Sequence, residues 1–126
     1  MNGHGFGYIG RILETLHPSI TIADGDGVFV YVGKSCADFF GVTADHLIGK
    51  KANDPEIQDI FRPCVTLMVY EQRQKIVTFQ KNLNGSETMV TGMPIFSEDG
   101  ALEMILVISS WEISSYKELQ TSYQQL

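Results

Sequence analysis

Three glycine-containing turns, each between runs of β-branched and aromatic residues, constrain the fold more than any other feature of this sequence. They are Asp24-Gly25-Asp26-Gly27, Asn84-Gly85 and Glu98-Asp99-Gly100. Residues of these types accept the backbone angles of tight hairpin turns, whereas the flanking residues favour extended backbone. The first turn predicts a hairpin of residues 20–23 and 28–32. The other two turns predict a three-stranded meander of residues 76–80, 88–96 and 102–110.

The segment between these two groups of strands has the features of short helices. Thr43 and Asp54 are N-capping residue types, and Pro55 suits the first turn of a helix. Pro63 cannot continue a helix, so we place it in the first turn of a further helix that runs through Glu71. Helices between two groups of antiparallel strands predict an α+β fold with the sheet covered on one face.

Amphipathic segments flank this central region on both sides. One apolar stripe predicts an N-terminal helix and consists of Ile9, Ile12, Leu13 and Leu16. A second stripe has heptad spacing and consists of Tyr116, Leu119, Tyr123 and Leu126. We therefore divide the chain into 1–18, an N-terminal helical cap, 19–111, the central domain, and 112–126, the start of an exiting signalling helix that we expect to lead into a further domain.

Composition and charge exclude several classes of function. The 126 residues are 44% hydrophobic, which is enough for one core, and the net charge of -6 is the wrong sign for binding a phosphate backbone. No apolar run is long enough to span a membrane, and the N-terminus lacks a signal peptide. We expect a cytoplasmic domain that binds neither nucleic acid nor membrane, with Cys36 and Cys64 reduced.

Motifs that could carry chemistry lack the context they need. Gly5-Phe6-Gly7-Tyr8-Ile9-Gly10 has the spacing of a dinucleotide fingerprint, but no strand precedes it. Asp24 and Asp26 could open a calcium loop, but its twelfth position holds Ser35 instead of glutamate. The three histidines are scattered, and no nucleophile elbow is present, so we predict no metal site and no enzyme.

Soft apolar side chains are expected on the inner side of the sheet, where they would line a ligand pocket or simply fill the core. These candidates are Phe39, Cys64, Met68, Phe79, Met89, Met93 and Met104. Methionine adapts its shape to a ligand as readily as to a core, so both interpretations stay open.

The stretch from Ile20 to Trp111 resembles a PAS domain. The resemblance rests on the opening hairpin, on Phe39-Phe40-Gly41-Val42 with Leu47-Ile48-Gly49-Lys50, and on the closing hairpin from Val90 to Gly100. It implies a PAS-like five-stranded antiparallel sheet with helices on one face, and a sensory or interaction module instead of a catalyst. The closing segment looks most like PAS domains of bacterial sigma-54-dependent transcriptional regulators, and sensor histidine kinases use similar domains.

The family also bears on cofactors. Haem-binding members use a histidine on the long helix, but none occurs between Pro55 and Arg73, and the Asn-Cys-Arg-Phe-Leu-Gln-type signature of flavin photosensors is absent. We therefore expect neither haem nor a photoactive flavin, and a small organic metabolite if there is a ligand.

The expected function is to bind a small ligand or a partner and to relay that state to a downstream output domain of the same chain, as a homodimer. One alternative is a small α+β pocket enzyme, for which Asp38, Glu87 and Glu103 are the acid or base candidates. Another is a structural PAS module whose cavity is filled by its own methionines.

Overall fold

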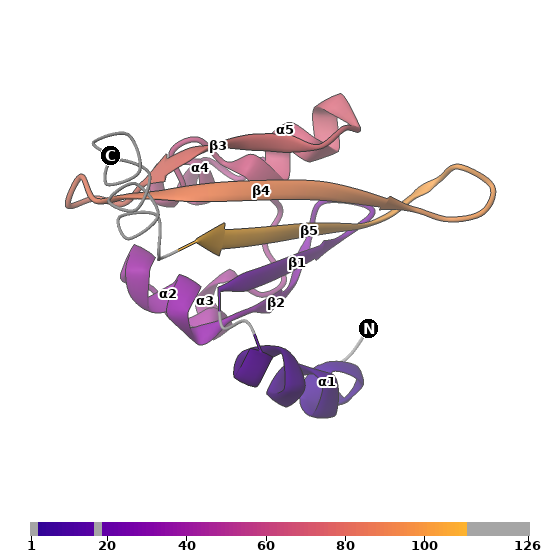
Figure 1. The fold of residues 1–126 in the computed structure, drawn as a ribbon, viewed down its shortest axis with the longest axis horizontal. Coiled ribbons are helices and arrows are strands. Elements are labelled where there is room, and N and C mark those ends of the chain that lie inside the picture. The colour runs from indigo at the N-terminus through magenta and orange to yellow at the C-terminus, as the bar shows by residue number, and fades with distance from the viewer. Residues whose placement is uncertain (1–2, 17–18, 111–126) are drawn as a thin grey trace, which may run out of the picture.

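A single antiparallel sheet organises the part of the chain that the computed structural model describes, residues 3–16 and 19–110. Its strands follow the order β2-β1-β5-β4-β3 (Figure 1). Their bounds are β1 Ile20–Asp24, β2 Phe29–Val32, β3 Ile76–Lys81, β4 Glu87–Phe96 and β5 Leu102–Ser110. Strand β5, the last in the sequence, therefore lies at the centre and pairs with both β1 and β4. The predicted five strands and their antiparallel pairing are confirmed.

Helices α3 and α4 begin at capping residues that the sequence predicts, and α2 ends at a glycine. Their bounds are α1 Gly3–Leu16, α2 Lys34–Phe40, α3 Ala44–Leu47, α4 Pro55–Ile60 and α5 Val65–Gln72. Gly41 ends α2 at a φ of 72°, which glycine adopts without strain. The side chains of Thr43 and Asp54 accept hydrogen bonds from the backbone N–H groups of His46 and Glu56.

One detail of the predicted helices is wrong. Pro63 does not lie in the first turn of α5, because Cys64 has extended backbone angles and α5 begins at Val65. The residues 61–64 instead form a connection between α4 and α5 that lies outside both helices.

Two clusters of buried side chains join the helices to the sheet. One cluster connects β2 with helices α2, α3 and α4 around Phe29, Phe40 and Ile57. The other connects α5 with the middle of the sheet around Val65, Val90 and Ile105. We call the side of the sheet that carries α2–α5 the inner face and the opposite side the outer face.

Gly92 allows α5 to lie directly against β4. A Cβ atom at this position would come within 2.6 Å of Val65 Cγ1 and 2.7 Å of Val69 Cγ2, both on α5. Real Cβ atoms do not approach other carbons this closely, so the distance between helix and strand depends on glycine. The N-terminal turn of α5 is thereby held at a fixed height above the sheet.

Helix α1 lies apart from the other helices, beside β2 (Figure 1). The Tyr31 hydroxyl on β2 donates a hydrogen bond of 3.2 Å to the Gly10 carbonyl. The predicted N-terminal helix is confirmed, and the Gly5–Gly10 motif lies inside it instead of forming a phosphate-binding turn. The predicted exiting helix, with Tyr116, Leu119, Tyr123 and Leu126, falls outside the described residues.

A substitution at Gly92 tests the close approach of α5. Gly92→Ala forces the helix away from the sheet, and we expect it to lower the free energy of unfolding by about 1–3 kcal/mol. Urea denaturation measures this change. Thr91→Val, on the outer face of the same strand, is the matched control and should change the stability by less; an unchanged midpoint for Gly92→Ala would contradict the packing described here.

Candidate functional site

A small cavity, here called the central cavity, lies enclosed between the inner face of the sheet and the helices. Its volume is about 10 Å³, which leaves room for one water molecule. The lining side chains come from four strands, from α2 and α5, and from the connection between α4 and α5. They are Thr21, Phe29, Cys36, Phe61, Cys64, Thr66, Gln80, Val107 and Ser109.

Polar groups form much of this lining, although it lies in the interior of the protein. Thr21, Thr66, Gln80 and Ser109 are each less than 5% exposed. Two of these side chains form a hydrogen bond within the protein. Gln80 Nε2 donates to the Pro63 carbonyl at 2.7 Å, and Thr21 Oγ1 donates to Cys36 Sγ at 3.3 Å. None of the lining residues has a carboxylate, ammonium, guanidinium or imidazole group.

Aromatic rings form the apolar part of the wall. The rings of Phe29 and Phe61 stack with centroids 6.0 Å apart, and Phe40 packs on Phe61 with centroids 4.5 Å apart. These contacts hold Phe61 in place although it lies outside regular secondary structure. The cavity is therefore lined by both aromatic and hydrogen-bonding groups.

Both cysteines of the chain line the central cavity as free thiols. Burial raises the pKa of Cys36 from its ordinary value of 9.0 to about 11, against a smaller lowering effect of Thr21. Burial likewise raises the pKa of Cys64 to about 11. Both groups are neutral S–H groups at physiological pH, and neither has the reactivity of a thiolate.

Four of the seven pocket candidates do not face the cavity. Gln80, Val90 and Ile105 point to the inner face, so alternation along the strands places the neighbouring side chains on the outer face. These outer-face residues are Phe79, Met89, Met93 and Met104. The expectation that they lie on the inner side is therefore wrong, and the methionines of the sheet do not fill the cavity.

The remaining candidates lie on the helical side of the sheet. Cys64 lines the cavity. Phe39 is half-buried and packs edge-on against Phe40 with centroids 5.0 Å apart, and Met68 is half-buried on α5.

The sequence contained a signal for the lining residues that we missed. In β3, apolar Val77 and Phe79 alternate with polar Thr78 and Gln80, and an apolar-inward interpretation selects the wrong pair. The structure places Gln80 inside, while Val77 and Phe79 are 56% and 41% exposed. If the apolar residues of β3 are assigned to the outer face, its polar residues Thr78 and Gln80 point inward and indicate a polar cavity.

The acid and base candidates of the enzyme alternative are all exposed. Asp38, Glu87 and Glu103 lie at the surface, and none of them lines the central cavity. Within residues 3–16 and 19–110, no three histidine, cysteine or acidic side chains come together in a way that could hold a metal ion. The same residues contain no helix with the length and apolar character required to cross a bilayer.

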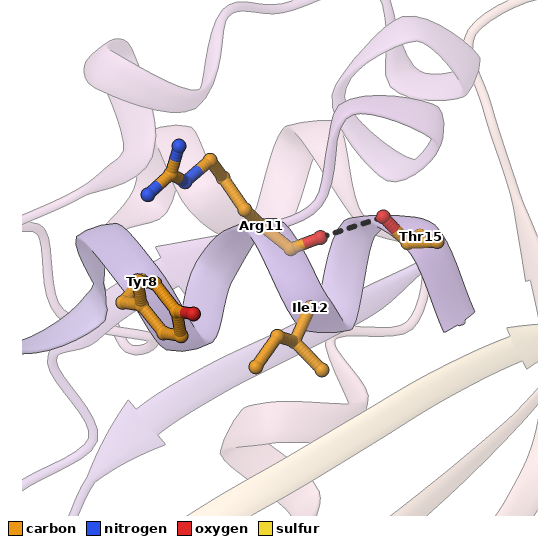
Figure 2. A pocket seen from close by; sticks show the side chains of 4 residues that line it. All are labelled: Tyr8, Arg11, Ile12 and Thr15. Carbon is orange, nitrogen blue, oxygen red and sulfur yellow. Dashed lines mark hydrogen bonds between the residues drawn. The ribbon is translucent and has the colours of Figure 1, made fainter.

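A second, larger hollow of about 420 Å³ lies on the surface of α1. Figure 2 shows the four side chains that line it, Tyr8, Arg11, Ile12 and Thr15, all from this one helix. The Arg11 guanidinium lies 5.4 Å from the centre of the Tyr8 ring, and Thr15 Oγ1 donates to the Arg11 carbonyl at 2.8 Å.

The described residues form a five-stranded antiparallel sheet with short helices and a small cavity between them. The family model of the PAS fold matches residues 8–109 of the 126-residue chain. The chain therefore belongs to the PAS family, whose members are typical of signal transduction and are generally not enzymes. Comparison with curated proteins gives no significant match.

Solved structures agree with this fold at low sequence identity. The PAS domain of Bordetella pertussis BvgS is 17% identical with a TM-score of 0.60, covering 98% of this chain and 100% of that domain. The PAS domain of the histidine kinase ThkA is 16% identical with a TM-score of 0.57, covering 73% and 96%. The light-state LOV domain of the blue-light photoreceptor Aureochrome1 is 14% identical with a TM-score of 0.55, covering 92% and 98%. At these identities the likeness establishes the fold alone.

The buried thiols make stability depend on alkaline pH. Below pH 9 the folded and unfolded states both keep the thiol protons. Between pH 9 and 11 the unfolded state loses them while the folded state keeps them, so the free energy of unfolding falls as pH rises. Urea denaturation at pH 8, 9 and 10 measures this slope.

The matched comparison is the double variant Cys36→Ala/Cys64→Ala. It changes no other ionisable side chain, so only the thiol contribution is removed. We expect a shallower loss of stability with pH in the variant. Equal slopes in the two proteins would contradict the buried, neutral state of the thiols.

Proposed function

We propose that this PAS domain is a sensory input module that binds a small ligand in the central cavity and relays that state to a downstream output domain. The observation that carries the proposal is the cavity between sheet and helices, whose lining combines buried polar side chains with aromatic rings. A core selected for stability alone would be filled by apolar side chains. The polar lining is therefore more readily explained by recognition than by packing.

The output that we propose is a domain of a bacterial transcriptional regulator, in the cytoplasm. This assignment rests on the resemblance of the closing segment to PAS domains of sigma-54-dependent regulators. The alternative is a sensor histidine kinase, which is favoured by the likeness of the fold to the PAS domain of ThkA. In both cases residues 112–126, with Leu119 and Tyr123 in the heptad stripe, would connect the domain 19–111 to its output.

A small organic molecule remains the ligand class that we propose in place of haem or flavin. The LOV likeness raises the question of a flavin, but the space in the cavity corresponds to one water molecule. A tricyclic ring system would require the whole wall to move.

We further propose that the module acts as a homodimer through α1 and the outer face of the sheet. Tyr8, Ile9 and Ile12 on α1 are 72%, 52% and 47% exposed, and Ile95 on β4 is 43% exposed. Large apolar side chains gathered at a surface are typical of protein interfaces. A second copy supplies a matching apolar surface, because the same side chains are exposed on it.

Native mass spectrometry over a concentration series tests ligand binding and dimerisation together. We expect a dimer that carries a small extra mass, which disappears when the protein is denatured. A bare monomer at every concentration would contradict both proposals. A dimer without extra mass would support dimerisation and would contradict the expectation that the ligand stays bound through purification.

A charge on α1 tests the dimer surface. Ile12→Asp places a carboxylate on the apolar stripe, and we expect it to weaken self-association about tenfold or more, because burying an unpaired charge is costly. Sedimentation velocity at matched concentrations measures this. Asn84→Asp adds the same charge in an exposed hairpin turn that accepts either residue, and it should leave association unchanged. Equal association of the two variants would exclude α1 from the interface.

A further inference from the structure

Three buried polar side chains of the central cavity have hydrogen-bonding atoms without a protein partner in the described part of the chain. The hydroxyls of Thr66 and Ser109 form no side-chain hydrogen bond within residues 3–16 and 19–110, and both side chains line the cavity. Among these residues, the Gln80 side-chain amide has a hydrogen-bond partner at its nitrogen but not at its oxygen. Because a carbonyl can only accept, the Pro63 carbonyl fixes Nε2 as the donor and leaves Oε1 without a partner among the same residues.

Unpaired polar atoms inside a protein reduce its stability, and they are satisfied by a guest wherever space allows. The guest must meet a defined pattern here. Gln80 Oε1 accepts only, so the guest has to supply an N–H or O–H donor. The hydroxyls of Thr66 and Ser109 can each donate, so the guest can also carry an acceptor.

The guest must also be uncharged. The cavity is lined by hydroxyl, thiol, amide and hydrocarbon groups only, so a buried ion would find no counter-charge. The rings of Phe29 and Phe61 supply the aromatic part of the lining. Polar and aromatic lining groups together suit a small molecule that has both hydrogen-bonding and apolar parts.

We propose that the central cavity binds a small neutral molecule with both a hydrogen-bond donor and an acceptor, of which an amide is the simplest, and that Thr66, Gln80 and Ser109 recognise its polar edge. This inference rests on the proposed sensory function and names its ligand class. A guest larger than one water molecule requires side chains of the cavity wall to move apart.

Three probes of nearly the same shape test the chemistry. Acetamide is neutral and offers a donor and an acceptor, acetone is neutral and offers an acceptor only, and acetate at pH 7.5 is charged. Each is titrated into the purified isotope-labelled protein, and the backbone amide resonances of Thr66, Gln80 and Ser109 are followed by NMR. We expect saturable shifts with acetamide at a dissociation constant on the order of millimolar, much weaker binding of acetone, and none of acetate.

A double variant assigns the binding to the polar edge. Thr66→Val/Ser109→Ala removes both hydroxyls with little change of shape, and we expect acetamide to bind about fivefold more weakly or worse. Since the variant also removes two unpaired polar groups, it should be at least as stable as the natural protein in urea. A clear loss of stability would show that the hydroxyls are already paired in the protein and would overturn the proposal. Asn84→Asp, in the exposed hairpin turn, is the control and should leave acetamide binding unchanged.

The outcomes separate this proposal from the proposed function. If acetamide and acetate bind equally, or neither shifts the cavity resonances, the ligand class is wrong. If the protein nevertheless carries an extra mass in native mass spectrometry, the sensory function stands with a ligand of different chemistry. If it carries no extra mass and no probe binds, both proposals are overturned.

Discussion

Helix α5 rests on the backbone of β4 because Gly92 places no side chain between them. This contact determines where the first turn of α5 lies, and that turn carries two of the cavity residues, Cys64 at the N-cap and Thr66 within the helix. The aromatic stacking of Phe61 on Phe29 fixes the other end of the same connection. The shape of the cavity thus follows from one close contact between helix and strand and from one aromatic pair.

Local features of the sequence predicted the elements and their order. The turns at Asn84-Gly85 and Glu98-Asp99-Gly100, and the caps at Thr43 and Asp54, depend on backbone geometry that these residue types dictate by themselves. The resemblance to PAS domains then implied a five-stranded sheet, and the structure and the family match agree with it.

The faces of the strands could not be predicted in the same way. Alternation separates Val77 and Phe79 from Thr78 and Gln80, but it does not reveal which pair points inward. The usual rule assigns the apolar pair to the core, and it fails here because the sheet carries apolar side chains on the outer face and a polar cavity beneath the inner face. Both departures from the rule occur where we propose that the domain binds something, which is where local patterns and the overall fold are expected to disagree.

The central strand places the two surfaces one residue apart. Ser109 of β5 lines the cavity, while Ile108 points to the outer face and pairs with Ile20 on one side and Thr91 on the other. A rotation of the strand that improves contact at Ser109 also changes the position of Ile108. Coupling between two binding events is reciprocal in free energy, so an occupant of the outer face would alter ligand affinity by the same factor by which the ligand alters association. Cellular concentration of the protein would then become part of its ligand sensitivity.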